Sequence, residues 1–237
     1  MRQFTYFVVA ALSSVACVSI DTDPGEGPGE IPPTPGPLIE FNPSAAIIPF
    51  PNNLVLDPST GRVALPAQCN ESAAQTGLRT GVLNTLDGFA TFKAVLQFTS
   101  TEAVDANTLA SSVRLIRRAT AGTLADPATE QPVPLVALPS MTQRNAADCS
   151  GTTPVNSVVL VPSVPLRGSS TYVVSVSSEI KTATSADFFP SSTWALIRQA
   201  SNPVTVEDGV VVAERTPLDM NDPADVPTLL GIDRLWR

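Results

Sequence analysis

The heptapeptide KAVLQFT at residues 93–99 alternates apolar and polar side chains. Its two faces would carry Ala94, Leu96 and Phe98 on one side and Lys93, Gln97 and Thr99 on the other. A period of two over this length is typical of a strand with one face on a core. Comparable strand-like runs follow downstream: Ser112–Arg118, Pro132–Leu138, Asn156–Val161 and Thr171–Ser177. We therefore expect an all-β fold.

Two of these runs predict their places in a sheet. Pro132–Leu138 contains prolines, which lack the backbone donor of a central strand, so we expect an edge strand. Asn156–Val161 is almost continuously apolar, which is typical of a strand covered on both faces. Short strands separated by Gly, Pro, Asn and Asp turns predict a β-sandwich over residues 92–200.

The regions on either side of the strands are less regular. Residues 38–91 are apolar at first but interrupted by prolines, which predicts an extended arm packed on the sandwich. Within the arm, residues 66–81 are polar, and we expect a loop there. Near the other end, Trp194–Arg198 could form a final strand.

Residues 201–237 form a C-terminal extension. Asp219, Asp222 and Asp225 stand at a Pro-rich turn, where carboxylates cap a helix start. A short helix is expected to follow, with an apolar stripe made of Val226, Leu229, Leu230 and Trp236. Because nothing stops this helix, we expect the extension to be the start of a missing or truncated region.

Residues 1–16 have the features of a signal peptide. A basic residue, Arg2, precedes an apolar run and the small residues SSVA at 13–16. The apolar run is shorter than the roughly 20 residues that span a bilayer. Residues 17–37 are rich in Pro, Gly and acidic residues, which predicts an extended, solvated tether.

Cys17, directly after the expected cleavage point, resembles the modified cysteine of bacterial lipoproteins, although Ser14 stands where that motif usually carries Leu. The resemblance implies a lipid-modified Cys17 and a membrane partner reached through the lipid anchor. Val18 differs from the Asp that signals inner-membrane retention in related lipoproteins, so an outer-membrane location, on the periplasmic or cell-surface face, is expected. The alternative is an ordinary secreted chain cleaved nearby.

Composition excludes several classes of function. The net charge is −8 and the chain holds no histidine. The acidic balance argues against a nucleic-acid partner, which calls for a basic patch. Without histidine there is no Ser-His-Asp triad, and the scarce cysteines do not provide a zinc site. We expect no catalytic residue, no cofactor, no metal and no small-molecule substrate. Acid–base hydrolysis by Asp219, Asp222 and Asp225 is a weaker alternative to capping.

If Cys17 carries lipid, Cys69 and Cys149 remain as a pair in an oxidising compartment, which favours a disulfide between them. Closing a loop of this length stabilises a fold by about 4–5 kcal/mol in the chain-entropy model. Two unpaired thiols are the alternative.

Two segments resemble bacterial Ig-like domains of the S-layer type: FTSTEAVD at 98–105 and LRGSSTYVVSV at 166–176. The resemblance implies an Ig-like β-sandwich with an N-terminal arm and a short C-terminal helix. In such a unit Val104 and Leu109 would hold a loop against the core, Asp105 would cap a turn, and Gly168 would permit a tight turn before Tyr172. Tyr172 is expected to pack or to make a corner hydrogen bond.

A second set of motifs is similar to the N-terminal region of bacterial surface or extracellular lipases described as virulence-factor lipases. The motifs are FNP at 41–43, IPFPNNL at 48–54 and LNTLDGF at 83–89. In those lipases an α/β-hydrolase domain with a G-x-S-x-G nucleophile follows, and this chain has no G-x-S-x-G. Two functions remain open: a lipid-anchored binding or scaffold module with an unknown envelope partner, or the non-catalytic accessory domain of a truncated lipase or esterase.

Overall fold

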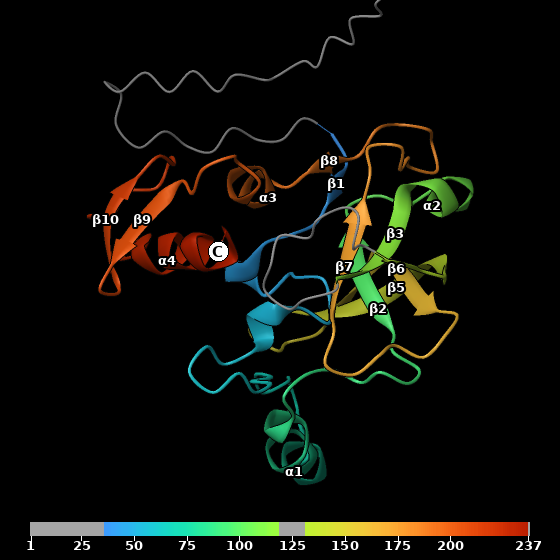
Figure 1. The fold of residues 1–237 in the computed structure, drawn as a ribbon, viewed down its shortest axis with the longest axis horizontal. Helices are drawn as coiled ribbons and strands as arrows, with labels where there is room; N and C mark the ends of the chain where they lie inside the picture. The colour runs from blue at the N-terminus through green and yellow to red at the C-terminus, as the bar shows by residue number, and fades with distance from the viewer. Residues whose placement is uncertain (1–35, 119–130, 237) are drawn as a thin grey trace, which may run out of the picture.

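The computed structural model describes residues 36–118 and 131–236, and shows a β-rich fold with a short C-terminal helix (Figure 1). The signal peptide, Cys17 and the tether lie outside the described residues. The strands are β1 Leu38–Ile39, β2 Leu96–Ser100, β3 Val113–Arg118, β4 Gln131–Val133, β5 Leu135–Asn145, β6 Thr152–Pro162, β7 Thr171–Val176, β8 Phe189–Pro190, β9 Val204–Glu207 and β10 Val210–Glu214. The helices are α1 Ala73–Gly81, α2 Ala106–Ser112, α3 Ser192–Ile197 and α4 Val226–Trp236, with short 3-10 turns η1 Pro43–Ala45, η2 Asn53–Val55 and η3 Leu83–Thr85.

Two sheets face each other across a shared core. The larger has the order β5-β6-β2-β1-β8, and the smaller has the order β4-β3-β7. Buried side chains of both sheets meet between them: Leu96, Phe98, Val158 and Leu160 from the larger, and Val113 and Leu115 from the smaller. The alternation predicted for residues 93–99 is confirmed from residue 96 onward, where Leu96 and Phe98 are buried while Gln97 and Thr99 are less so; residues 93–95 precede the strand.

The loop between β2 and β3 is held as the sequence predicts. Asp105 caps α2 by accepting a hydrogen bond from the Asn107 backbone N–H at 2.9 Å. Val104 and Leu109 are buried in the shared core. The expected roles of these three residues are therefore confirmed.

Tyr172 makes the expected corner hydrogen bond. Its hydroxyl oxygen accepts from the Arg167 backbone N–H at 2.6 Å, which closes the turn before β7. The turn uses a different residue from the one predicted: the left-handed backbone conformation belongs to Ser169, with φ of 50°, and Gly168 does not adopt it. The glycine is thus not required by a positive φ.

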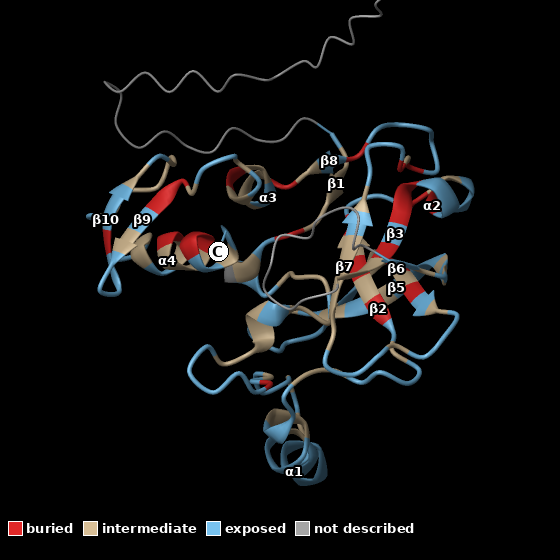
Figure 2. Ribbon diagram, viewed as in Figure 1, coloured by how far each residue is buried: buried red, intermediate tan, exposed pale blue. Residues whose placement is uncertain are grey.

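The C-terminal residues build a second, smaller core beside the sheets. Strands β9 and β10 form a hairpin, α4 packs on it, and α3 packs on α4. Its buried members are Leu196, Val204, Val211, Leu229 and Ile232. Figure 2 shows the two groups of buried residues, one between the sheets and one beside α4. The expected C-terminal helix is confirmed as α4.

Two sequence predictions about helices are wrong. Trp194–Arg198 belongs mostly to α3, which Ser191 caps by accepting from the Trp194 N–H. Apolar residues two positions apart, Trp194 and Leu196, also fit a strand, and the Ser191 cap is the feature that favours a helix. Residues 66–81, expected to be a loop, contain α1, which begins with a capping box between Ser72 and Gln75.

Candidate interaction surface

The outer face of the larger sheet carries apolar side chains that the described residues leave exposed. Residues directly opposite in neighbouring strands share a face, and Val136 pairs with Val161 and Leu138 with Val159. The row continues across β2 through Gln97 to Phe50, which exchanges both backbone hydrogen bonds with Gln97. Val136 is 50% and Leu138 52% exposed. Phe50, Val136, Leu138, Val159 and Val161 are called the outer apolar face below.

The expectation that the apolar run 156–161 is covered on both faces is therefore wrong for the described residues. Val158 and Leu160 are buried between the sheets, but Val159 is only partly buried and Val161 is exposed. A continuously apolar strand is typical of a sheet covered on both faces, but here only one face of the strand is fully covered. Ser157, on the same outer side of β6, is buried, so the outer face is covered near Ser157 and is without a layer of described residues at Val161, Val136 and Leu138.

The other end of the same outer face is polar. Arg144 of β5 holds the Glu40 carboxylate with two hydrogen bonds, of 3.1 and 2.6 Å, and donates to the Thr99 hydroxyl at 3.2 Å. Burial raises the pKa of Glu40, but the hydrogen bonds from Arg144 and Thr99 outweigh burial, so that the pKa lies below its ordinary value. This ion pair marks where the outer apolar face ends.

Helix α1 adds a second set of exposed apolar side chains. None of its residues is buried, and the helix projects away from both sheets (Figure 1). Leu78 and Val82, four positions apart on one side of the helical turn, are both exposed, as is Leu86 beyond them. The ring of Phe89 packs edge-on against Phe50 at 5.8 Å, which connects the α1 region to the outer apolar face.

An ion pair between two residues of the α1 region stabilises that region. Glu71 accepts from Arg79 at 2.7 and 2.9 Å in a bidentate ion pair that joins the residue before the helix cap to the helix. Hydrogen bonding from Arg79 lowers the pKa of Glu71 from 4.5 to about 2. Such paired geometry orients both side chains and keeps Glu71 ionised in mild acid.

Glu71→Gln is expected to remove a pH-dependent contribution to the stability of α1. A carboxyl whose pKa is lowered in the folded state stabilises it fully above its unfolded pKa, here 4.5. That contribution is lost as the pH falls through the folded value of about 2. The protection of α1 amides from hydrogen exchange is measured between these two pH values and corrected for the intrinsic exchange rate. It should change with pH in the wild type and change less in Glu71→Gln. Glu179→Gln, at an exposed position, is the control, and equal profiles in all three proteins would contradict the prediction.

The open edge of the larger sheet is protected by a proline. Backbone N–H and C=O groups of successive residues in a strand point to opposite neighbours. Gln97 bonds Phe50, so the backbone groups of Phe98 point to Val158 of β6, and those of Val158 point back to β2. The backbone of Pro139, which lies opposite Val158 on β5, therefore faces the open edge. The range Pro132–Leu138 lies at sheet edges as predicted, but it is divided between two strands, β4 at the edge of the smaller sheet and β5 at the edge of the larger. Pro139 presents no N–H at the middle of the β5 edge, which disfavours pairing with another chain.

Pro139→Thr is expected to increase self-association through this edge, because it restores the missing donor on an 11-residue strand. Sedimentation velocity over a concentration series measures the effect. Ser140→Thr is the matched control, since the backbone of that residue faces β6. Identical sedimentation of the two variants would contradict the blocking role of Pro139.

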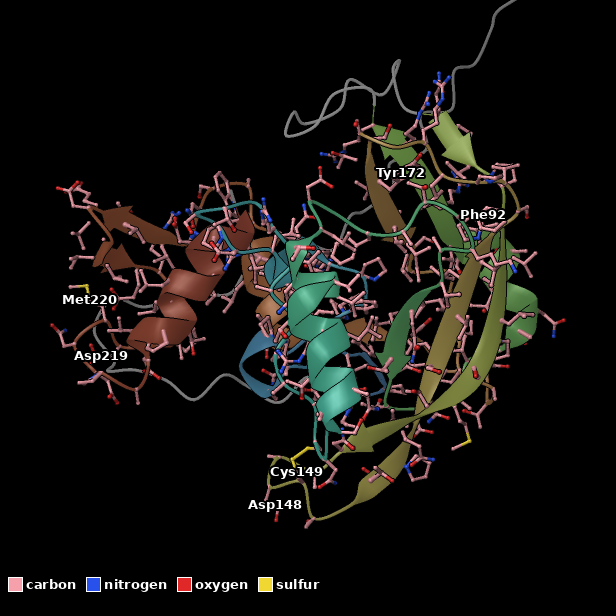
Figure 3. All side chains as sticks on the ribbon, turned by 90° about the horizontal axis from the view of Figure 1, so that it is seen from below. Phe92, Asp148, Cys149, Tyr172, Asp219 and Met220 are labelled. Atoms are coloured by element: carbon pink, nitrogen blue, oxygen red, sulfur yellow. A yellow bond between two sulfur atoms is a disulfide. The ribbon has the colours of Figure 1, made fainter. Side chains whose placement is uncertain are left out.

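The structure brings together one pair of the predicted site residues. Cys69 and Cys149 form a disulfide with Cα atoms 5.4 Å apart, which confirms the predicted bridge. Figure 3 shows it at the tip of the β5–β6 hairpin, at the opposite end of the molecule from Phe92. The predicted lipidation site, Cys17, lies outside the described residues.

The three aspartates act in turns. Asp225 accepts from the Asp219 backbone N–H at 3.0 Å, Asp219 from Asn221 at 2.8 Å and Asp222 from Ala224 at 2.9 Å. All three carboxylates therefore accept from N–H groups of the turn before α4, and none of these bonds caps the helix itself as the sequence predicts. In residues 36–118 and 131–236 no group of three or more Cys, Asp or Glu side chains is placed to hold a metal. No helix in the same part of the chain is long and apolar enough to cross a membrane.

Comparison of the chain with protein-family models, with curated proteins and with solved structures found no match.

Proposed function

We propose that this chain is a lipid-anchored binding or scaffold module of the bacterial cell envelope, with an Ig-like sandwich as its body and no catalytic activity of its own. The observation that carries the proposal is the outer apolar face, which has the pattern of a buried sheet face but is exposed. Contiguous exposed apolar surface marks sites of protein association. The partner is a protein that lays a flat apolar layer on Val136, Leu138 and Val161.

The motif FTSTEAVD, the Tyr172 corner and the capped α2 loop support the Ig-like part of the proposal. The anchor is proposed from the signal-like residues 1–16 and from Cys17. An outer-membrane site, facing the periplasm or the cell surface, goes with that anchor.

The anchor is tested by fractionating bacteria that express the wild type, Cys17→Ala or the control Ser19→Ala. The wild type and Ser19→Ala should sediment with membranes, and Cys17→Ala should become soluble or remain unprocessed. Intact mass of the membrane-bound protein should show a diacylglycerol. A Cys17→Ala protein distributed like the wild type would contradict the anchor.

The partner surface is tested by placing a photo-crosslinking amino acid at position 138 in cells. We expect one discrete protein adduct, absent when the same probe replaces Val210, an exposed position on β10. An adduct with a second copy of the chain would replace the partner by a homodimer, and the absence of any adduct would contradict the proposal. Ester hydrolysis by the purified chain would contradict the non-catalytic role.

A second candidate is the non-catalytic accessory domain of a longer lipase or esterase. The motifs IPFPNNL at 48–54 and LNTLDGF at 83–89 favour it, and both lie beside the outer apolar face through Phe50 and Phe89. In this case the covering layer would be a hydrolase domain of the same polypeptide. An in-frame G-x-S-x-G and a histidine encoded beyond codon 237 would decide for this candidate.

A further inference from the structure

Residues 66–83, called the α1 loop here, form a self-contained unit. The side chain of Asn84 closes its neck by accepting from the Leu65 backbone N–H at 2.9 Å and donating to the Leu65 carbonyl at 3.2 Å. Beyond the neck, the capping box and the pair of Glu71 and Arg79 are bonds within the loop. These bonds shape the α1 loop, but a nine-residue helix that buries none of its residues is marginal on its own, so the helix also depends on how the loop is fixed to the rest of the chain.

The attachment of this loop to the sheets is narrow. Among the described residues, its hydrogen bonds and ion pairs stay within residues 65–86, apart from a 3.9 Å contact between Cys69 Sγ and the Ala146 carbonyl oxygen. Helix α1 buries none of its residues. The covalent link to the β5–β6 hairpin is the disulfide, because Cys149 lies in the turn that Ala146 and Gly151 close with a 2.9 Å hydrogen bond.

The bridge is open to attack from solvent. Cys149 is exposed and lies at the outer end of the hairpin, while Cys69 is half-buried (Figure 3). Thiol–disulfide exchange requires access of a thiolate to one sulfur, and Cys149 is the more exposed residue of the pair. Neither of the two hydrophobic cores contains either cysteine.

We propose that the Cys69–Cys149 disulfide is a redox-sensitive latch that fixes the α1 loop to the β5–β6 hairpin, and that its reduction releases the loop from an otherwise folded chain. The latch sets where Leu78 and Val82 lie relative to the outer apolar face. This inference concerns the conformation of the chain and holds whether or not a partner binds that face.

The reductant is a dithiol, such as a dithiol oxidoreductase. One of its thiolates attacks Cys149 Sγ, the sulfur–sulfur bond breaks, and Cys69 leaves as a thiolate. The second thiol of the reductant then attacks the reductant sulfur that is bonded to Cys149, which releases Cys149 as a thiol. Two electrons and two protons pass to the cysteine pair, and the reductant becomes a disulfide.

The test is hydrogen exchange, read by mass spectrometry, on the purified oxidised chain, on the chain reduced by dithiothreitol without denaturant, and on the double variant Cys69→Ser/Cys149→Ser. Amides of residues 73–82 should exchange at least about tenfold faster in both bridge-free forms, while those of β2 and β6 keep their protection. Ser150→Ala, which changes the same turn and retains the bridge, should behave like the oxidised wild type.

Three results would overturn the latch. The first is unchanged exchange of α1 in a chain whose mass shows the gain of two hydrogens. The second is equal acceleration in β2 and β6, which would make the bridge a support of the whole fold. The third is a bridge that the dithiol opens only in denaturant. Reduction of the wild type keeps the test decisive should the double variant fail to fold.

Discussion

Leu115→Ala is expected to lower the free energy of unfolding by about 4 kcal/mol. Leu115 is 1% exposed and lies in β3 between Val133 of β4 and Val174 of β7. Its side chain fills the space between the two sheets, where the neighbours belong to paired strands and cannot move in to close a cavity. Removing a buried leucine side chain costs about 2–5 kcal/mol, the upper part of the range applying where the site cannot collapse.

The matched control for Leu115→Ala is Leu138→Ala, the same chemical change on the outer apolar face. Leu138 is half-exposed, so its removal should change the free energy of unfolding by no more than about 0.5 kcal/mol. Urea titration followed by far-UV circular dichroism measures both, with the slope against urea checked for constancy. Similar losses in the two variants would show that the outer face is covered in the isolated chain.

The sheets were predictable because their signal is local and repeated. In residues 93–99 each second side chain is apolar, and the structure buries two of them, Leu96 and Phe98. Tyr172 and Asp105 were predictable for a similar reason, since each bonds a backbone group within five residues. Periodicity cannot give the strand order, because pairing depends on which faces meet across long stretches of chain.

The missed helices show where composition misleads. Residues 66–81 are polar because α1 is nearly surrounded by solvent, and a polar segment resembles a loop. The sequence does contain a helix signal, Ser72 followed three positions later by Gln75, which the structure uses as a capping box. In α3, Ser191 is the corresponding start signal. A search for helix-capping residues would have predicted both helices, whereas composition did not.

The error over the strand 156–161 bears most on function. Its apolar pattern predicts two covered faces, and the structure covers one. Sequence patterning records the surroundings in which a strand is stable, and these include partners that an isolated chain lacks. The disagreement between pattern and burial is therefore the reason to place the interaction surface on β5 and β6.

Leu229→Ala is the second large expected effect, about 3 kcal/mol, and it should act on a different part of the molecule. Leu229 lies in α4 and is fully buried against Leu196, Val204 and Val211. This cluster shares no buried residue with the core between the sheets. The only two tryptophans of the chain, Trp194 and Trp236, lie in α3 and α4, so tryptophan fluorescence reports on this cluster.

In Leu229→Ala the fluorescence transition should therefore move to lower urea concentration while the circular dichroism transition of the sheets moves less. In Leu115→Ala the order should reverse. Coincident transitions in both variants would mean that the two clusters unfold as one cooperative unit. Some links favour such coupling: Arg234 donates to the Leu56 carbonyl of the arm, and the buried Phe41 packs edge-on against Trp194 at 5.3 Å and accepts at its carbonyl from the Ser191 hydroxyl at 2.8 Å. Because none of these linking residues belongs to either core, we expect the two transitions to separate.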